Sequence, residues 1–344
     1  MASSSAFRYA RFAVPAASAT FLSSWKFVTQ CDSDYNDIRN PQQQEPTSQA
    51  SFSSYYGMKF DEPGDFHGLF PKRQLWQPKV EYPLWDPNWD GRSPSSTGDV
   101  EEDRRKLRKI RKEGVTRHII LVRHGQYDER LKEDAQRKLT ELGKLQAEYT
   151  GRRLREMIQG VQGTTDFTPC NIKIVRVSNM ARAKETASII MSQLPNSVQL
   201  AEPDPDLNEG RPAHNIPGGK ASASTVEKFD EQHPRIERAF QKYFYRADEP
   251  KEEDEEDDDG DKNDSEQSKH EFEIIVCHAN VIRYFLCRAL QLPPEAWLRL
   301  CTFNCSLTYL TIRPTGTVSC RMLGDIGHLP YGLSSFSGHH GYNW

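Results

Sequence analysis

The sequence predicts an α/β domain with a mainly parallel central sheet, preceded by a non-globular N-terminal region. Three apolar runs have the composition of buried strands, and a segment with helical patterning follows each of them. Strands that alternate with helices are typical of parallel sheets, because the crossover helix returns the chain to the edge where the previous strand began. Only 36% of the 344 residues are hydrophobic, so we also expect extended solvated segments.

The elements of this domain follow one another from about Thr116. A strand over 118–122 leads through a loop to a helix that opens near Thr140, whose hydroxyl can cap the first turn. Five apolar residues would supply the buried face of that helix: Leu142, Leu145, Tyr149, Leu154 and Met157. The other expected elements are a strand over 172–177, a helix through 181–187, a helix over 226–246, a strand over 272–277, a helix through 281–285 and a strand over 308–313.

The first 31 residues have the composition of a mitochondrial transit peptide. They are rich in serine and alanine, contain Arg8, Arg11 and Lys26, and include no acidic residue. The stretch 12–27 is apolar, although it is shorter than the roughly 20 residues that span a bilayer. We therefore expect 1–31 to act in mitochondrial targeting, with membrane anchoring as an overlapping role. A tail with neither role stays open.

Residues 32–115 form a predicted linker that carries two distinctive segments. The hexapeptide 85–90 contains two Trp-Asp pairs in the order Trp85, Asp86, Pro87, Asn88, Trp89, Asp90. Exposed tryptophans are unfavourable in water, so we expect them to dock either on the chain's own catalytic domain or on a neighbouring subunit. The basic segment 101–117 is either a solvated helix face or a contact for anionic lipid, nucleic acid or an acidic partner.

An acidic insertion, 248–271, interrupts the predicted domain. It contains 14 acidic and three basic residues, and no protein core can absorb such a run, so it belongs on the surface. The tail 331–344 has no clear pattern. The seven cysteines include no CxxC pair, and no nearby histidine pair joins Cys301 and Cys305, so the sequence indicates free thiols and no metal site.

Two histidines that each follow a strand are the strongest functional signal. His124 comes directly after Arg123 at the end of the first strand, and His278 follows the strand 272–277. Open α/β sheets bind their ligands at the carboxyl ends of strands, so we expect these histidines to share one site. A neutral imidazole can attack phosphorus, and a guanidinium can hold phosphate through its planar fork of donors. We therefore predict a phosphoryl-transfer site with His124 as nucleophile and Arg123 as a phosphate ligand.

Three more residues complete the predicted site. Arg182 would clamp the phosphate oxygens, on which negative charge develops during transfer, and His278 would donate to one of them. Glu209 is expected to protonate the leaving oxygen, which requires a carboxyl group with a raised pKa. Two other acids on the same loop are alternatives for that role: Glu202 and Asp206.

The order of these residues along the chain resembles the histidine phosphatase superfamily, in its phosphoglycerate-mutase-like branch. The resemblance covers 116–330, and it implies a three-layer α/β/α sandwich whose catalysis needs neither a metal nor another cofactor. The implied roles are phosphorylated nucleophile for His124, phosphate binding for Arg123, Arg182 and His278, and proton donor for Glu209.

The segments 276–285 and 290–299 are similar to the mitochondrial Ser/Thr protein phosphatases of that superfamily, and so is the hexapeptide 85–90. This similarity implies phosphoprotein substrates, a mitochondrial and membrane-associated location, and a homo-oligomer in which assembly activates the enzyme. It also implies an oligomerisation role for Trp85, Asp86, Asn88, Trp89 and Asp90. The acidic insertion 248–271 is not part of the resemblance.

Two other functions stay open. One is a small-molecule phosphatase or phosphoglycerate mutase on the same fold, although the short segment 195–225 favours an open pocket and a protein substrate. The other is a membrane-associated scaffold that uses the hexapeptide, the basic segment and the acidic insertion to assemble partners. Nucleic-acid binding is not favoured, because the basic segment lacks an associated aromatic platform or recognition fold.

Overall fold

The computed structural model describes residues 85–160, 170–216, 222–250 and 269–336, all of which fall within one compact unit. None of the helices in these ranges is long and apolar enough to cross a membrane. The predicted targeting segment 1–31 lies outside the described residues, as do most of the acidic insertion and the end of the tail.

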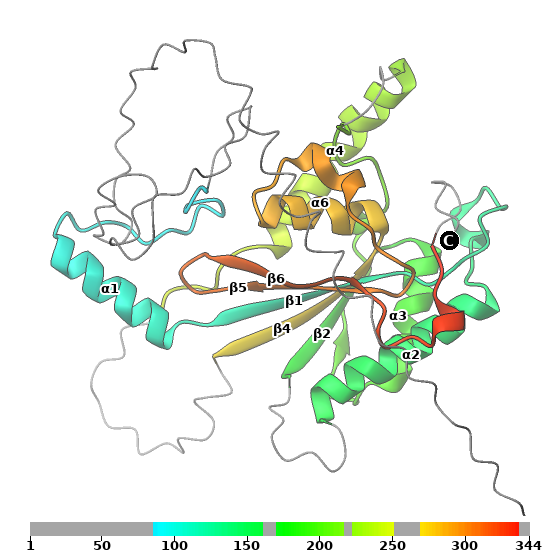
Figure 1. Cartoon of the computed structure of the whole chain (residues 1–344), viewed down its shortest axis with the longest axis horizontal. Helices are drawn as coiled ribbons and strands as arrows, with labels where there is room; N and C mark the ends of the chain where they lie inside the picture. Colours follow the sequence, from blue (N-terminus) through cyan, green and yellow to red (C-terminus); the bar gives the residue numbers. More distant parts are fainter. Residues whose placement is uncertain (1–84, 161–169, 217–221, 251–268, 337–344) are drawn as a thin grey trace, which may run out of the picture. The chain divides into compact units, whose positions relative to one another are not determined.

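A six-stranded sheet forms the centre of the described unit, with the strand order β3-β2-β4-β1-β5-β6 (Figure 1). The strands β3, β2, β4 and β1 pair in parallel, whereas β5 is antiparallel to both of its neighbours. Five of these six strands therefore run in the same direction, which confirms the mainly parallel sheet. The strands are β1 (Thr116–Arg123), β2 (Ile172–Val177), β3 (Gln199–Leu200), β4 (His270–Cys277), β5 (Leu307–Ile312) and β6 (Val318–Asp325).

Helices cover both faces of the sheet and give the expected three layers (Figure 1). Alternate side chains of a strand point to opposite faces, so Ile119 and Leu121 of β1 join one core cluster while Ile120 and Val122 join the other. The first cluster packs against α4 (Ala223–Tyr243) and α6 (Ala279–Ala289), and the second against α2 (Glu141–Gln159) and α3 (Ala181–Gln193). The short 3₁₀ helices are η1 (Asp134–Gln136), η2 (Pro205–Leu207), η3 (Pro294–Arg299) and η4 (Tyr331–Leu333).

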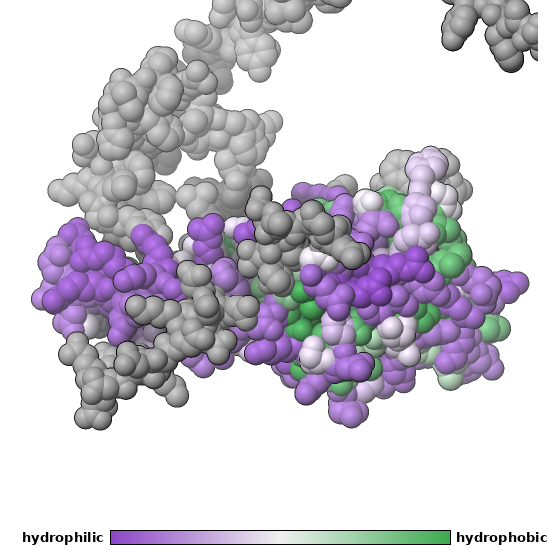
Figure 2. All heavy atoms as spheres, turned by 90° about the horizontal axis from the view of Figure 1, so that it is seen from below, coloured by the Kyte–Doolittle hydropathy of each residue, from purple (hydrophilic) through white to green (hydrophobic). Residues whose placement is uncertain are grey.

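The basic segment divides into a helix and a strand. Helix α1 (Val100–Glu113) begins at Asp99, whose side chain accepts from two backbone N–H groups of the first turn, and Ile110 is its one buried residue. Hydrophilic side chains gather over this helix at the left of Figure 2. Arg117 does not continue the helix, because it lies in β1 and forms a buried ion pair with Glu273 over 3.0 Å.

The hexapeptide 85–90 docks on its own chain. The indole N–H of Trp89 donates to the carbonyl oxygen of Gly316 over 2.9 Å, and its ring packs against Phe240. Asp90 forms an ion pair of 2.7 Å with Arg246, and the two side chains are only 1% and 3% exposed. These contacts confirm the expectation of docking on the catalytic domain. A contact with a neighbouring subunit stays a prediction, and Trp85 remains 39% exposed.

Candidate active site

The pairing of β1 with β4 brings the two predicted histidines to one edge of the sheet. Arg123 lies opposite Cys277 in this parallel pair, so the residues that follow them, His124 and His278, leave the sheet side by side. The backbone N–H of His124 donates to the carbonyl oxygen of Cys277 over 3.0 Å, and the two imidazole centroids lie 5.1 Å apart. The sequence prediction of a shared site therefore agrees with the fold.

His124 has its unprotonated nitrogen directed into the site. Its Nδ1 lies 2.8 Å from the carbonyl oxygen of Gly125, which can only accept, so we assign the proton to Nδ1. Its Nε2 accepts a hydrogen bond of 3.3 Å from Nε of Arg182. Burial lowers the pKa of His124 well below 6.5, and the charges of Arg182 and Arg123 lower it further. The ring is therefore neutral at pH 7, with its lone pair on Nε2.

His278 has the opposite tautomer. Its Nε2 lies 2.8 Å from the hydroxyl oxygen of Ser178, and that hydroxyl donates its own proton to Asn208 over 2.8 Å. Nε2 of His278 must then carry the proton, while Nδ1 is buried without a hydrogen-bond partner. Burial, followed by the charge of Arg182, lowers the pKa of His278. A ligand that accepts at Nδ1 would favour the doubly protonated ring.

Two arginines flank the histidines. Arg182, at the start of α3, is 2% exposed and pairs with Asp134 over 3.3 Å, while its guanidinium carbon lies 4.7 Å from the centre of the Tyr127 ring. Arg123 is 3% exposed and donates from Nη1 to the carbonyl oxygen of Thr302 over 2.7 Å. Nε of Arg123 has no partner, so it has a donor left for a ligand.

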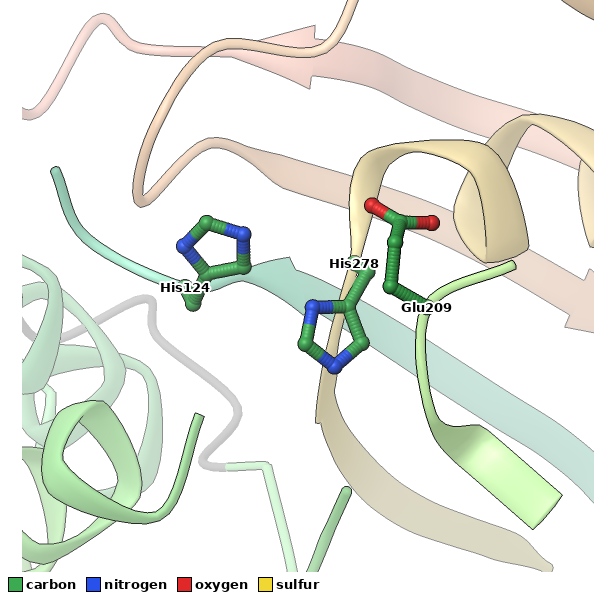
Figure 3. Close-up of side chains that lie close together, drawn as sticks. All are labelled: His124, Glu209 and His278. Carbon is green, nitrogen blue, oxygen red and sulfur yellow. The ribbon is translucent and has the colours of Figure 1, made fainter. Parts of the chain in front are cut away.

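Glu209 lies on the loop after η2 and faces the two histidines (Figure 3). Burial raises the pKa of this carboxyl group, against the opposing charges of Arg182 and Arg123. The side chain of Asn280 holds the loop by donating to the carbonyl oxygen of Gly210 over 3.1 Å. The alternative acids are not in the site, because Glu202 is exposed and Asp206 pairs with Arg238.

His124, Glu209 and His278 each offer one ligand atom, and these atoms lie within 4.8 Å of one another. Such a group can in principle hold a metal ion. The guanidinium groups of Arg123 and Arg182 stand beside it, and their positive charge disfavours a cation and favours an anion. The donor set therefore fits a phosphate better than a metal.

A pocket of about 190 Å³ opens at this site. Arg123, His124, Arg182 and Glu209 line its wall, whereas His278 is completely buried behind it. The sequence reasoning missed several lining residues. Arg283 could have been predicted, because an arginine inside an apolar helical run is unusual. The missed residues are Tyr127, Arg137, Ala279, Asn280, Arg283 and Phe336.

Comparison with known proteins identifies relatives of this chain. The sequence profile described as "Histidine phosphatase superfamily (branch 1)" matches residues 119–324, more than half of the chain. The chain is 42% identical over 262 residues to "Serine/threonine-protein phosphatase Pgam5, mitochondrial" of Caenorhabditis elegans, covering 74% of this chain and 81% of the relative. It is also 42% identical to the protein of that name from Xenopus laevis, covering 72% and 82%.

A solved structure of a phosphoglycerate mutase from Plasmodium falciparum is 34% identical, with a TM-score of 0.38, and the match covers 63% of this chain and 96% of that one. The family that the sequence motifs indicated is confirmed by the profile and by the two relatives. The chain belongs to the histidine phosphatase superfamily (branch 1).

Proposed function

We propose that this protein is a metal-independent Ser/Thr protein phosphatase that works through a phosphohistidine on His124. The observation that carries the proposal is the buried neutral imidazole with its lone pair on Nε2, beside the phosphate-binding arginines Arg123 and Arg182. The substrate class comes from relatives that carry the name Ser/Thr-protein phosphatase.

In the first step, Nε2 of His124 attacks phosphorus, a P–N bond forms and the bond to the threonyl or seryl oxygen breaks. Glu209 gives its proton to that leaving oxygen, which its raised pKa permits. Arg123 and Arg182 stabilise the non-bridging oxygens as charge develops on them. His278 joins them when its Nδ1 carries a proton, which an anionic ligand favours. The two arginines are already in position, so they need little reorganisation.

In the second step, water attacks the phosphohistidine. Glu209, now a carboxylate, accepts a proton from the water as the new P–O bond forms. The P–N bond breaks, and its electron pair returns to Nε2 of His124. Inorganic phosphate leaves, and the neutral histidine and protonated glutamate are restored, so the cycle balances without an external acid or a metal.

We further propose that the enzyme acts in mitochondria, on or near a membrane, and that assembly of several copies raises its activity. The relatives' names support the location, and the exposed ring of Trp85 leaves the hexapeptide a surface for a second copy. Replacing Trp85 and Trp89 together with alanine should lower both the oligomer mass, by light scattering, and the specific activity. An unchanged mass would count against the assembly role.

The decisive experiment measures hydrolysis of a phosphothreonine peptide in the presence of a metal chelator. Wild-type protein should release phosphate and form an acid-labile phosphoenzyme, and His124→Ala should do neither while its circular dichroism stays unchanged. His214→Ala, which removes an exposed histidine outside the pocket, is the matched control and should keep activity. Turnover of 3-phosphoglycerate or 2,3-bisphosphoglycerate alone would indicate a metabolic enzyme, and no turnover by the assembled protein would favour a scaffold.

A further inference from the structure

We propose that Arg283 binds a second anionic group of the substrate, next to the phosphoryl group that His124 accepts. Arg283 lies on α6, five residues after His278, and lines the same pocket as His124 and Arg123. This inference rests on the proposed function, in which His124 accepts the phosphoryl group. With Arg283 as a second anion site, the enzyme selects phosphorylated residues that have a carboxylate or another phosphate close by.

Arg283 is a buried charge whose side chain lacks a hydrogen-bond partner in the described ranges. Arg283 is 4% exposed, its Nε is buried without an acceptor, and its side chain forms no hydrogen bond or ion pair with any residue in the described ranges. A buried guanidinium without an acceptor destabilises the folded state. Burial accordingly lowers its pKa, with Glu209 as the largest opposing influence.

The other buried arginines in the described ranges make the contrast clear. Arg117 pairs with Glu273, Arg182 pairs with Asp134, and Arg123 donates to a backbone carbonyl oxygen. Arg246 pairs with Asp90. On α6 itself, the partly buried Arg288 donates two hydrogen bonds to Glu237, of 3.0 and 2.8 Å. Each of these arginines therefore has at least one acceptor, whereas the side chain of Arg283 has none in the described ranges.

The lining of the pocket carries an excess of positive charge. Four arginines line the pocket, and among the described residues Glu209 is the only carboxyl group that lines it. Burial raises the pKa of that carboxyl group. A phosphoryl dianion is balanced by Arg123 and Arg182, and Arg137 is partly exposed to water. The charge of Arg283 then stays uncompensated. A second anionic group on the substrate would supply the missing charge.

Arg283 and Arg123 share an aromatic neighbour at the pocket. The ring of Phe336 lies against the guanidinium groups of Arg123 and Arg283. The centre of the ring is 5.5 Å from the guanidinium carbon of Arg123 and 5.7 Å from that of Arg283. An arginine fork recognises carboxylate and phosphate through paired hydrogen bonds. We therefore expect the second group to be an acidic side chain or a second phosphorylated residue beside the one that is hydrolysed.

Turnover of three phosphothreonine peptides tests this proposal. The peptides share one sequence except for the neighbouring residue, which is asparagine, aspartate or phosphoserine. Wild-type kcat/KM should favour the two anionic peptides by about tenfold, equivalent to about 1.4 kcal/mol, mainly through KM. Arg283→Gln should bring that ratio close to one, and Arg283→Lys should restore part of it. Arg288→Gln is the matched control on α6 and should keep the wild-type ratio.

A binding experiment separates this proposal from the proposed function. Calorimetry on the His124→Ala protein compares 3-phosphoglycerate with glycerol 3-phosphate, which lacks the carboxylate. The carboxylate ligand should bind about tenfold more tightly, and adding Arg283→Gln should remove the difference. If no peptide is hydrolysed, the proposed function fails while this comparison still tests Arg283. A wild-type ratio near one in both experiments, or a ratio that Arg283→Gln leaves unchanged, would overturn the proposal.

Discussion

The hydroxyl oxygen of Ser178 lies 2.8 Å from Nε2 of His278 and determines which ring nitrogen carries the proton. Because that hydroxyl donates to Asn208, it accepts from the ring, and Nδ1 is left for the ligand. A serine at the end of one strand thus orients a histidine at the end of the neighbouring strand. The contact also explains how a completely buried imidazole keeps a single orientation.

Ser178→Ala should therefore lower kcat by about tenfold or more, by analogy with lost second-layer contacts to metal-bound histidines. KM should change less, because the arginines still bind the phosphoryl group. Nitrogen NMR of the histidine rings should reveal a mixture of tautomers at His278. Ser192→Ala, at an exposed position on α3, is the control. Equal kinetics for the two variants would contradict the orienting role.

The pH dependence should be bell-shaped. Burial lowers the pKa of His124 below 6.5. As pH increases through that lowered pKa, the ring loses its proton and kcat/KM rises. Burial raises the pKa of Glu209 above 4.5, so kcat/KM falls at higher pH as the carboxyl group loses its proton. Glu209→Gln should abolish the falling limb and slow peptide hydrolysis by about 10²–10⁴-fold.

The loss in Glu209→Gln should be smaller with p-nitrophenyl phosphate, whose leaving group needs no proton. A falling limb that survives in Glu209→Gln, measured from pH 4 to pH 9, would assign that limb to another group.

A close approach between two backbones supports His124, the proposed nucleophile. A Cβ added at Gly143, in the first turn of α2, would collide with the carbonyl oxygen of Gln126, and one added at Gly125 would lie 2.5 Å from the carbonyl oxygen of Gly143. Gly143→Ala should cost about 1–3 kcal/mol of unfolding free energy and displace the carbonyl that accepts from His124. Thermal unfolding and kcat measure the two effects.

Gly332→Ala provides the control for Gly143→Ala, because a Cβ at Gly332 meets no atom within 4 Å. If the two alanine variants unfold at the same temperature, the backbone contact does not matter for stability.

The docked hexapeptide should be stabilised by its buried ion pair. Asp90→Ala leaves Arg246 buried without its carboxylate and should cost about 3–5 kcal/mol, whereas Trp85→Ala should cost little. Burial opposes ionisation of Asp90, but the hydrogen bonds from Arg246 outweigh it and lower the pKa below 3.8. The stabilisation is therefore complete above the unfolded pKa and is lost as pH falls through the lowered value.

Denaturant unfolding of Asp90→Ala, Arg246→Ala and the double variant gives the coupling between the two side chains. A coupling free energy near zero between Asp90 and Arg246 at pH 7 would mean that the ion pair does not stabilise the docked segment.

Much of the fold could be predicted because the strands under the site are continuously apolar. The patterns at β1 and β4 placed His124 and His278 correctly, and the cap at Thr140 is confirmed by its hydrogen bond to the N–H of Gly143. Strand β6 was missed, since this edge strand has no regular alternation of apolar and polar residues, and its exposed residues include Leu323 as well as Arg321.

The buried face of α2 was predicted only in part. Leu154 and Met157 are buried, but Leu145 is 43% exposed and the polar residues Gln146 and Thr150 are inside. Their hydrogen bonds run to residues far along the chain, such as the carbonyl oxygen of Cys305 for Thr150. The spacing of apolar residues carries no information about such distant partners. Phe336 could not be assigned to the pocket for the same reason, because it lies far along the chain from the other lining residues.

The parallel pairing of β1 with β4 also governs when the protein can become active. Thr116 lies opposite His270, 154 positions further along the chain, so this contact closes a very long loop. Such distant pairings form slowly and late. During synthesis, a chain that ends before β4 contains His124 but lacks both His278 and the strand that pairs with β1 in parallel. We therefore expect no fragment that ends before β4 to be active, and dephosphorylation to begin only after the chain has emerged past His278 and folded.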